Sequence, residues 1–201
     1  MDCGAFFEKA GSYARLSKAS RASWEGLLRA ESYKRGDFFL RFGERPSKVA
    51  FIVKGLLAQN YVSRTGDETI KYFFPEGRFA ASVGAMLAGR PSAFSLVALE
   101  DTRALCYDFH EFRRLVEQHS DIASFYIRYM ERHWIVEKEP LEISFRHDTA
   151  PARYREFLKS YPELAARLKK HHIASYLGVT PTQLSRILSQ RKEKSSASQH
   201  M

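Results

Sequence analysis

The sequence predicts an α+β protein of two domains: a jelly-roll-like antiparallel β-roll flanked by helices, then a long helix, then an all-α helix-turn-helix domain. Three observations support this order. Residues 33–107 contain short β-rich segments punctuated by glycine and proline, which is typical of antiparallel barrels and sandwiches. Residues 112–145 carry a continuous helical periodicity. Residues 171–188 fit two short helices joined by a tight break.

The basic charge is concentrated in the last part of the chain. The 201 residues are 44% hydrophobic, enough for ordinary cores, and the net charge is +9 at pH 7. From Pro151 onward ten Lys and Arg residues stand against three Asp and Glu residues. This clustering suits a surface that binds nucleic-acid phosphates. A basic tail kept for solubility would explain residues 191–194, but not Arg167, Lys169 and Lys170.

Several function classes are excluded by missing patterns. Cys3 and Cys106 alone form neither a zinc site nor a four-thiolate iron–sulfur cluster, so we expect no metal and no cofactor. The sequence shows no signal peptide and no apolar run near the ~18 residues of a membrane helix, which predicts a cytoplasmic protein without membrane contact. No metalloprotease, nucleophile-elbow, P-loop or paired-carboxylate pattern occurs, so we do not expect an enzyme.

The first 31 residues are expected to form short amphipathic helices that cover one end of a core. Strands are then expected at residues 38–42, 49–53, 56–63, 68–74, 94–99 and 102–109, with a hairpin turn at residues 64–67. Residues 79–93 are rich in small side chains, which favours one helical turn followed by a loop. Backbone N–H groups at residues 82–84 would suit an anion, and a plain structural connector is the alternative.

The long helix at residues 112–145 presents a candidate dimer interface. Side chains recur at spacings of four and three residues, as in a heptad, at Ile122, Tyr126, Tyr129, His133 and Val136. The pattern favours a homodimer with His133 as a packed polar residue rather than a metal ligand, and a helix packed only on its own β-roll is the alternative. Pro140 removes a helical hydrogen bond and predicts a break near Glu139, where the two domains would meet.

Residues 171–188 carry the most specific pattern. Gly178 can adopt a left-handed conformation and so ends the first helix, while Thr180 and Pro181 are a good N-cap and first residue for the second. Ala174 lets the two helices cross closely. The side chains expected to point outward are Thr182, Gln183, Ser185 and Arg186. This is the helix-turn-helix pattern, whose second helix enters the DNA major groove, and an ordinary αα-hairpin is the alternative.

Taken together, these elements resemble the Crp/Fnr superfamily of transcription regulators over nearly the whole chain. The segments that carry the resemblance are Lys34-Arg35-Gly36-Asp37, Ile52-Val53-Lys54-Gly55, Phe74-Pro75-Glu76-Gly77 and residues 173–186. Residues 91–95, 98–101 and 152–154 resemble a wingless subgroup, and the thirteen residues after Leu188 are too few for a β-hairpin wing. The resemblance implies a cyclic-nucleotide-binding fold for the β-roll and a homodimer that reads a two-fold symmetric site.

The ligand cassette departs from the pattern of members that bind cyclic AMP. Those members hold the ribose with a Glu and the phosphate with an Arg–Ser pair, and the matching positions here are Ser82, Ser92 and Ala93. None of these side chains offers the bidentate charged contact that a phosphate favours. Cyclic AMP is therefore not the expected effector. The degenerate ligand-binding set implied by the resemblance is Ser82, Val83, Gly84, Arg90, Ser92, Ala93, Glu137 and Lys138.

The residues of the predicted helix-turn-helix match the family pattern better than those of the ligand cassette do. The resemblance gives Arg186 the role of reading guanine, through a bidentate contact that discriminates by about 1–3 kcal/mol. Thr182 replaces a glutamate that accepts from cytosine, so the half-site should differ, and Gln183 could contact adenine. The expected DNA-binding residues are Lys169, Lys170, His172, Thr180, Thr182, Gln183, Ser185 and Arg186, and of these Lys169, Lys170, His172 and Thr180 are assigned to backbone phosphates.

The predicted function is a dimeric, sequence-specific transcription regulator that does not depend on cyclic AMP. Its expected partners are double-stranded DNA with a two-fold symmetric operator, a second copy of the chain, RNA polymerase and an unidentified small-molecule effector. The expected domains are a sensor at residues 1–111, a dimerisation helix at 112–145, a DNA-binding domain at 146–192 and a disordered tail at 193–201. The alternative is a small-molecule sensor that acts through protein contacts and has weak or vestigial DNA binding.

Overall fold

The computed structural model describes residues 3–63 and 68–198, and it confirms the predicted antiparallel β-roll with flanking helices. Within these residues the strands form two four-stranded sheets, in the orders β1-β8-β3-β6 and β2-β7-β4-β5. The strands are β1 (Arg29–Tyr33), β2 (Phe38–Leu40), β3 (Lys48–Lys54), β4 (Leu57–Val62), β5 (Glu68–Phe74), β6 (Phe79–Ala80), β7 (Ser95–Ala98) and β8 (Thr102–Asp108). The predicted hairpin turn at residues 64–67 lies outside the described part.

The interior of the β-roll is filled by small and branched side chains. Ile52 of β3, Leu57 of β4 and Leu96 of β7 are fully buried there. Gly55 makes the turn from β3 to β4 at φ +101°, and a side-chain carbon at this position would lie 2.6 Å from the Asp101 carbonyl oxygen. Because only glycine fits this conformation and this space, Gly55 is a packing requirement of the roll.

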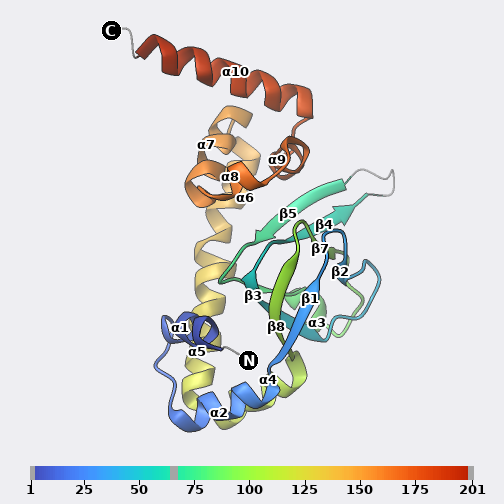
Figure 1. Ribbon diagram of the computed structural model, residues 1–201, viewed down its shortest axis with the longest axis vertical. Coiled ribbons are helices and arrows are strands. Elements are labelled where there is room, and N and C mark those ends of the chain that lie inside the picture. Colours follow the sequence, from blue (N-terminus) through green and yellow to red (C-terminus); the bar gives the residue numbers. More distant parts are fainter. Residues whose placement is uncertain (1–2, 64–67, 199–201) are drawn as a thin grey trace.

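Three helices cover the outer face of the first sheet (Figure 1): α1 (Gly4–Gly11), α2 (Lys18–Leu27) and α4 (Phe109–Gln118). The fully buried Phe6 ring lies 5.0 Å from Trp24 and 5.2 Å from Phe51, measured between ring centroids. The expected helical cover is therefore present. Its predicted end is wrong, because residues 29–31 belong to β1 and pair with β8. A partner strand far along the chain decides that segment, and local periodicity does not show it.

The long helix has three parts: α5 (Ser120–Met130), the π-helix η1 (Glu131–Val136) and α6 (Lys138–His147). It does not begin at residue 112, because extended backbone at His119 separates it from α4. The Glu137 N–H donates to the Arg132 carbonyl, five residues back, at 2.9 Å. Pro140 lies in the first turn of α6, where it has no N–H for the Val136 carbonyl. The irregular bonding therefore falls one turn before Pro140.

The chain continues with α7 (Ala150–Ser160), α8 (Leu164–Arg167), α9 (Lys170–Leu177) and α10 (Pro181–Ser198). Figure 1 shows α10 at the far end of the molecule, beyond α7 to α9. The tail at residues 193–201 was expected to be disordered; α10 is drawn as far as Ser198, and residues 199–201 lie outside the described part. Residues 190–194 are good helix formers, so local propensity favours a helix over this range.

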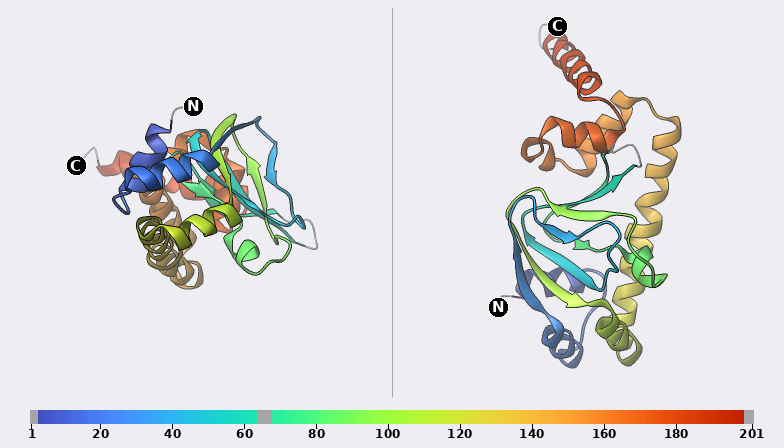
Figure 2. Two further views of the ribbon diagram at one scale, coloured as in Figure 1. Left: turned by 90° about the horizontal axis from the view of Figure 1, so that it is seen from below. Right: turned by 90° about the vertical axis from the view of Figure 1, so that its right-hand side faces the viewer.

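The C-terminal helices pack directly on the β-roll, beside the upper half of the long helix (Figure 2). Phe73 of β5 is fully buried, and its ring lies 5.2 Å from that of Tyr176 in α9. The Ser175 hydroxyl accepts the Ile70 N–H and donates to the Glu68 carbonyl, both at 2.9 Å. Because β5 is an edge strand of its sheet, α9 satisfies backbone groups that the edge would otherwise expose. One hydrophobic core thus joins the β-roll to the C-terminal helices.

Replacing Phe73 by alanine should lower the free energy of unfolding by about 3–5 kcal/mol, because a fully buried ring of this core is lost. Denaturant unfolding followed by circular dichroism measures the change. Phe42→Ala is the matched control, since Phe42 is 60% exposed and its loss should matter by no more than about 0.5 kcal/mol. A Phe73→Ala effect as small as the control's would contradict the shared core.

Candidate nucleic-acid interface and ligand cavity

The turn between α9 and α10 has the geometry that the sequence predicts. Gly178 ends α9 at φ 66° and ψ 39°, and the Val179 N–H donates to the Ala174 carbonyl at 3.0 Å. Thr180 and Gln183 then cap α10 reciprocally: the Gln183 N–H donates to Thr180 Oγ1 at 3.2 Å, and the Thr180 N–H donates to Gln183 Oε1 at 2.9 Å. These contacts fix the start of α10 relative to α9.

The N-terminal half of α10 separates a buried face from a polar one. Leu184 is fully buried, whereas Thr182, Ser185 and Arg186 are exposed, as expected. Gln183 is exposed too, but its amide oxygen already accepts in the cap. A bidentate contact to adenine needs both the oxygen and the nitrogen of the amide, so that contact would require the cap to open. The structure leaves the amide nitrogen of Gln183 as its available donor.

The residues assigned to phosphates differ in charge and exposure. Lys169 and Lys170 are exposed at the start of α9. Burial, together with the nearby His171 and Lys169, lowers the pKa of His172 to about 4, so that ring is neutral at pH 7 and cannot act as a cation. The Thr180 hydroxyl accepts within the cap and can still donate its hydrogen to a phosphate oxygen. Among the residues assigned to phosphates, the two lysines therefore carry the positive charge.

Arg167 does not belong to that basic surface, although the sequence places it just ahead of α9 and α10. Its guanidinium nitrogens lie 2.7 Å from Glu100 Oε2 and 2.9 Å from Glu76 Oε2. The hydrogen bonds to Glu100 and Glu76 raise the pKa of Arg167 further, so the group stays charged and paired. Arg167 thus ties α8 to two loops of the β-roll.

The degenerate cassette is closed by its own side chains. Ser82 and Ser92 are 4% and 2% exposed, and their hydroxyl oxygens lie 2.8 Å apart. The Ser92 oxygen also accepts the Phe94 N–H at 3.1 Å. Both hydroxyl groups are satisfied without a ligand. The other predicted cassette positions lie in or after the short helix α3 (Val83–Leu87): Val83 is half-buried, and Gly84, Arg90 and Ala93 are exposed.

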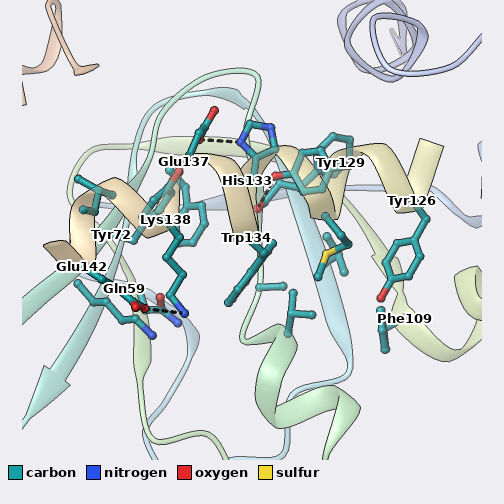
Figure 3. A pocket seen from close by; sticks show the side chains of 18 of the residues that line it. Gln59, Tyr72, Phe109, Tyr126, Tyr129, His133, Trp134, Glu137, Lys138 and Glu142 are labelled. Atoms are coloured by element: carbon teal, nitrogen blue, oxygen red, sulfur yellow. Dashed lines mark hydrogen bonds and ion pairs between the residues drawn. The ribbon is translucent and has the colours of Figure 1, made fainter. Parts of the chain in front are cut away.

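A cavity of about 450 Å³ lies between the β-roll, the long helix and α9. Figure 3 shows Trp134 and Lys138 on one side of the helix, pointing into this space, and His133 and Glu137 on the other side. Three members of the predicted ligand set line the cavity, namely Val83, Glu137 and Lys138. Sequence reasoning missed Lys71, Trp134 and Tyr176, which also line it. The i, i+4 spacing of Trp134 and Lys138 was the available signal for this second helix face.

The other side of the helix is anchored by a hydrogen-bonded cluster. The Tyr13 hydroxyl lies 2.6 Å from His133 Nε2, His133 Nδ1 lies 2.8 Å from Glu137 Oε2, and Arg78 donates to the same carboxylate at 3.0 Å. Burial lowers the pKa of His133. Partial burial alone would raise the pKa of Glu137, but the His133 hydrogen bond and the Arg78 charge lower it to about 2. The cluster holds η1 against the β-roll as an ionised, paired network.

Most of the predicted dimer positions contact their own chain. Ile122 is fully buried in the core beneath α1 and α2, and Tyr126, Tyr129 and His133 are half-buried against the same chain. Ile122 is therefore a core residue, which corrects its assignment to a dimer interface. Val136 is exposed. A heptad pattern marks which positions are apolar, but it does not identify the surface that covers them.

Residues 30–119 match the family model of the cyclic nucleotide-binding domain. FixK2 from Bradyrhizobium japonicum is similar with a TM-score of 0.69 and 18% identity, covering 84% of this chain and 86% of that one. A mutant of CooA from Carboxydothermus hydrogenoformans is similar with a TM-score of 0.67 and 18% identity, covering 89% and 82%. The predicted resemblance is therefore confirmed at the level of the fold, with a match to the cyclic nucleotide-binding domain over the β-roll.

A protein from Eubacterium rectale, described as a transcriptional regulator of the Crp/Fnr family, is similar to this chain with a TM-score of 0.61 and 14% identity, covering 89% of this chain and 85% of that one. No curated protein matches the sequence. At these identities the solved structures establish the fold alone. Within the described residues, no helix is long and apolar enough to cross a membrane, and no three His, Cys, Asp or Glu side chains are grouped to hold a metal ion.

Glu137→Gln should reduce the acid sensitivity of this fold. The folded-state pKa of Glu137 is about 2 against an ordinary value of 4.5, so its contribution to stability is complete above pH 4.5 and is lost as the pH falls toward 2. Between about pH 6 and about pH 3, the free energy of unfolding should fall by about 1–2 kcal/mol more in the wild type than in Glu137→Gln. Glu139→Gln, at an exposed neighbouring position, should behave as the wild type. Identical pH responses of all three proteins would exclude the ionised network.

Proposed function

We propose that this chain is a sequence-specific DNA-binding transcription regulator. The observation that carries the proposal is the geometry of α9 and α10, in which Gly178 and the Thr180–Gln183 cap present the N-terminal half of α10 outward. Recognition helices enter the major groove by that half. Lys169 and Lys170 are exposed beside it, where lysines suit backbone phosphates.

Base readout is assigned to three exposed side chains of α10. Arg186 has the donor geometry for the O6 and N7 atoms of guanine, and Thr182 and Ser185 can donate to or accept from several bases. Residues 181–190 contain no Asp or Glu, so a carboxylate contact to cytosine is absent from this half of the helix. Each half-site should therefore contain a guanine opposite Arg186, with weaker selection beside it.

A homodimer is part of the proposal. Exposed apolar side chains recur along one side of the long helix, at Ile127, Ile135, Val136 and Ile143. A second copy packed on this stripe would remove it from water and would place two α10 helices on a two-fold symmetric operator, about 34 Å apart. At a promoter such a dimer would act on RNA polymerase, by contact or by blocking its site. In this arrangement α7 to α10 are the DNA-binding domain.

Independence from cyclic AMP is also proposed. It is supported by the closed cassette, where the buried hydroxyl groups of Ser82 and Ser92 face each other and the nearby Arg90 is exposed. A cyclic phosphate would have to break this pair without gaining a buried guanidinium contact, and charged bidentate contacts supply much of the affinity in phosphate sites.

Selection of bound duplexes from a random pool at about 0.15 M salt, without a small molecule, should recover a two-fold symmetric motif with half-sites about ten base pairs apart. Arg186→Ala should relax the preference at one guanine per half-site and weaken binding by about 1–3 kcal/mol. Gln190→Ala, one turn further along α10, is the control and should keep the motif. An unchanged motif in Arg186→Ala would overturn the readout, and DNA binding without sequence preference would favour a sensor that acts through protein contacts.

The salt dependence of binding should separate the lysines from Arg167. Lys170→Ala should lower the slope of log affinity against log salt by about 0.9, because one phosphate contact is lost. Arg167→Ala should leave that slope unchanged, because its guanidinium is paired with Glu76 and Glu100. Fluorescence anisotropy with a non-specific duplex, between about 0.05 and 0.2 M salt, measures both slopes. The opposite result for the two variants would reverse these assignments.

A further inference from the structure

We propose that the open pocket between α1 and the long helix is a binding site for a small molecule that carries two or more linked phosphate groups. The pocket lies on the side of the long helix that His133 and Glu137 occupy, opposite the cavity described above (Figure 3). Apart from Glu137, none of its lining residues is among those assigned above to a ligand or to DNA. The proposal therefore goes beyond DNA binding, and its test needs no DNA.

The pocket holds an excess of positive charge. Its volume is about 700 Å³, and its lining includes four cationic side chains and one carboxylate, that of Glu137. His133 adds no charge at pH 7, because burial lowers its pKa below the ordinary value of 6.5. Four cations less one carboxylate leave three positive charges at one hollow of the surface. The four cations are Lys9 of α1, Arg78 between β5 and β6, and Arg128 and Arg132 of the long helix.

The Glu137 carboxylate does not neutralise all four cations. Arg78 Nη2 lies 3.0 Å from Glu137 Oε2, and His133 Nδ1 lies 2.8 Å from the same oxygen. Arg132 Nε lies 3.7 Å from the other oxygen, which is beyond hydrogen-bond range. Within the described part of the chain, Lys9 and Arg128 form no ion pair with a carboxylate. An anion that enters the pocket would therefore meet cations without a close partner.

The surroundings of Lys9 and Arg128 favour the binding of such an anion. Burial and the charges of Arg78 and Arg132 lower the pKa of Lys9. The Lys9 ammonium group lies 5.5 Å from the centre of the Tyr13 ring, a contact with a π face in place of a carboxylate. Arg128 Nη1 donates to the Tyr13 carbonyl at 2.8 Å, which orients the guanidinium and leaves its other donors available. An anion here would offset the repulsion among these cations.

The identity and the spread of the cations favour linked phosphates over a single small anion. Three of the four are arginines, whose planar donors form bidentate contacts with phosphate oxygens. They extend from α1, from the β5–β6 connection and from the long helix, so a ligand must present several negative oxygens to reach them together. The volume also lies within the roughly 300–1,000 Å³ of small-molecule sites.

Tyr13 holds the pocket in a fixed shape. Its hydroxyl lies 2.6 Å from His133 Nε2, and its ring lies 5.4 Å from that of Tyr129, measured between centroids. The residues on either side of the pocket are thus tied together before any ligand binds. A site that is ordered in advance loses less conformational entropy on binding, which favours affinity for a small charged ligand.

Isothermal titration calorimetry of the full chain with inorganic tripolyphosphate tests the site, at about 0.15 M salt and with inorganic phosphate as the comparison ligand. We expect one tripolyphosphate per chain, bound at least about tenfold more tightly than phosphate. Arg132→Gln should weaken tripolyphosphate binding by about tenfold, because it removes one guanidinium of the pocket. Arg114→Gln is the matched control and should leave binding unchanged, since Arg114 is 68% exposed against 66% for Arg132 and lies outside the lining.

A second variant separates lost binding from lost folding. Lys9→Met removes a charge that the neighbouring arginines repel, so it should raise the midpoint of denaturant unfolding while it weakens tripolyphosphate binding by about tenfold. A damaged fold would lower both. Equal affinity for phosphate and tripolyphosphate, or binding that neither Arg132→Gln nor Lys9→Met weakens, would overturn the site. Loss of binding in Lys170→Ala instead would place the anion on α9 and would also overturn the proposal.

Discussion

The docking of α9 on the edge strand β5 is the constraint on which the arrangement of the whole chain depends. It combines three different interactions: the buried Phe73–Tyr176 ring contact, the two hydrogen bonds of Ser175 to the β5 backbone, and the Arg167 ion pairs. The apolar contact supplies most of the free energy, and the hydrogen bonds fix the register. As a result, the orientation of α10 follows from the position of β5. A change in the β-roll can therefore reach α10 through one layer of side chains.

The π-helical segment η1 explains how one helix serves two surfaces. A π turn adds a residue to the helical turn and so rotates everything after it by about 100° relative to a regular α-helix. His133 and Glu137 face the Arg78 cluster, while their immediate neighbours Trp134 and Lys138 face the cavity. Ile122, before η1, is buried in its own chain, whereas Val136 at the end of η1 is exposed. The long helix thus bonds to the Arg78 cluster on one side, lines the cavity on another, and exposes apolar side chains elsewhere.

Features set by local chemistry could be predicted from the sequence. Gly178, Pro181 and Leu184 each act within one or two turns, and the structure places each of them as their chemistry requires. The strands between glycine turns follow for the same reason. Features that depend on distant partners could not be predicted. Residues 29–31 are helical by local pattern and become a strand by pairing with β8, and Arg167 looks like a phosphate ligand until Glu76 and Glu100 are folded beside it.

For Gln183 the sequence does not separate two roles, because a helix cap and a base contact would both use its side-chain amide. The sequence marks it as an outward side chain on a recognition helix, and its Oε1 atom satisfies the Thr180 N–H instead. A helix end leaves backbone donors that some acceptor must meet, and a Gln three residues after a Thr is well placed to do so. Residue identity therefore does not distinguish a cap from a base contact, whereas the geometry of the hydrogen bond to the Thr180 N–H does.

The closed Ser82–Ser92 cassette and the cavity beside the long helix are both features of the same β-roll. A phosphate site needs a guanidinium held out of bulk water, and an unliganded site of that kind leaves a charge without its partner. Two serine hydroxyls that bond to each other leave no such charge, so the Ser82–Ser92 region can stay folded without a ligand. The roll then supports α9, and a cavity lies at the junction lined by Trp134 and Tyr176.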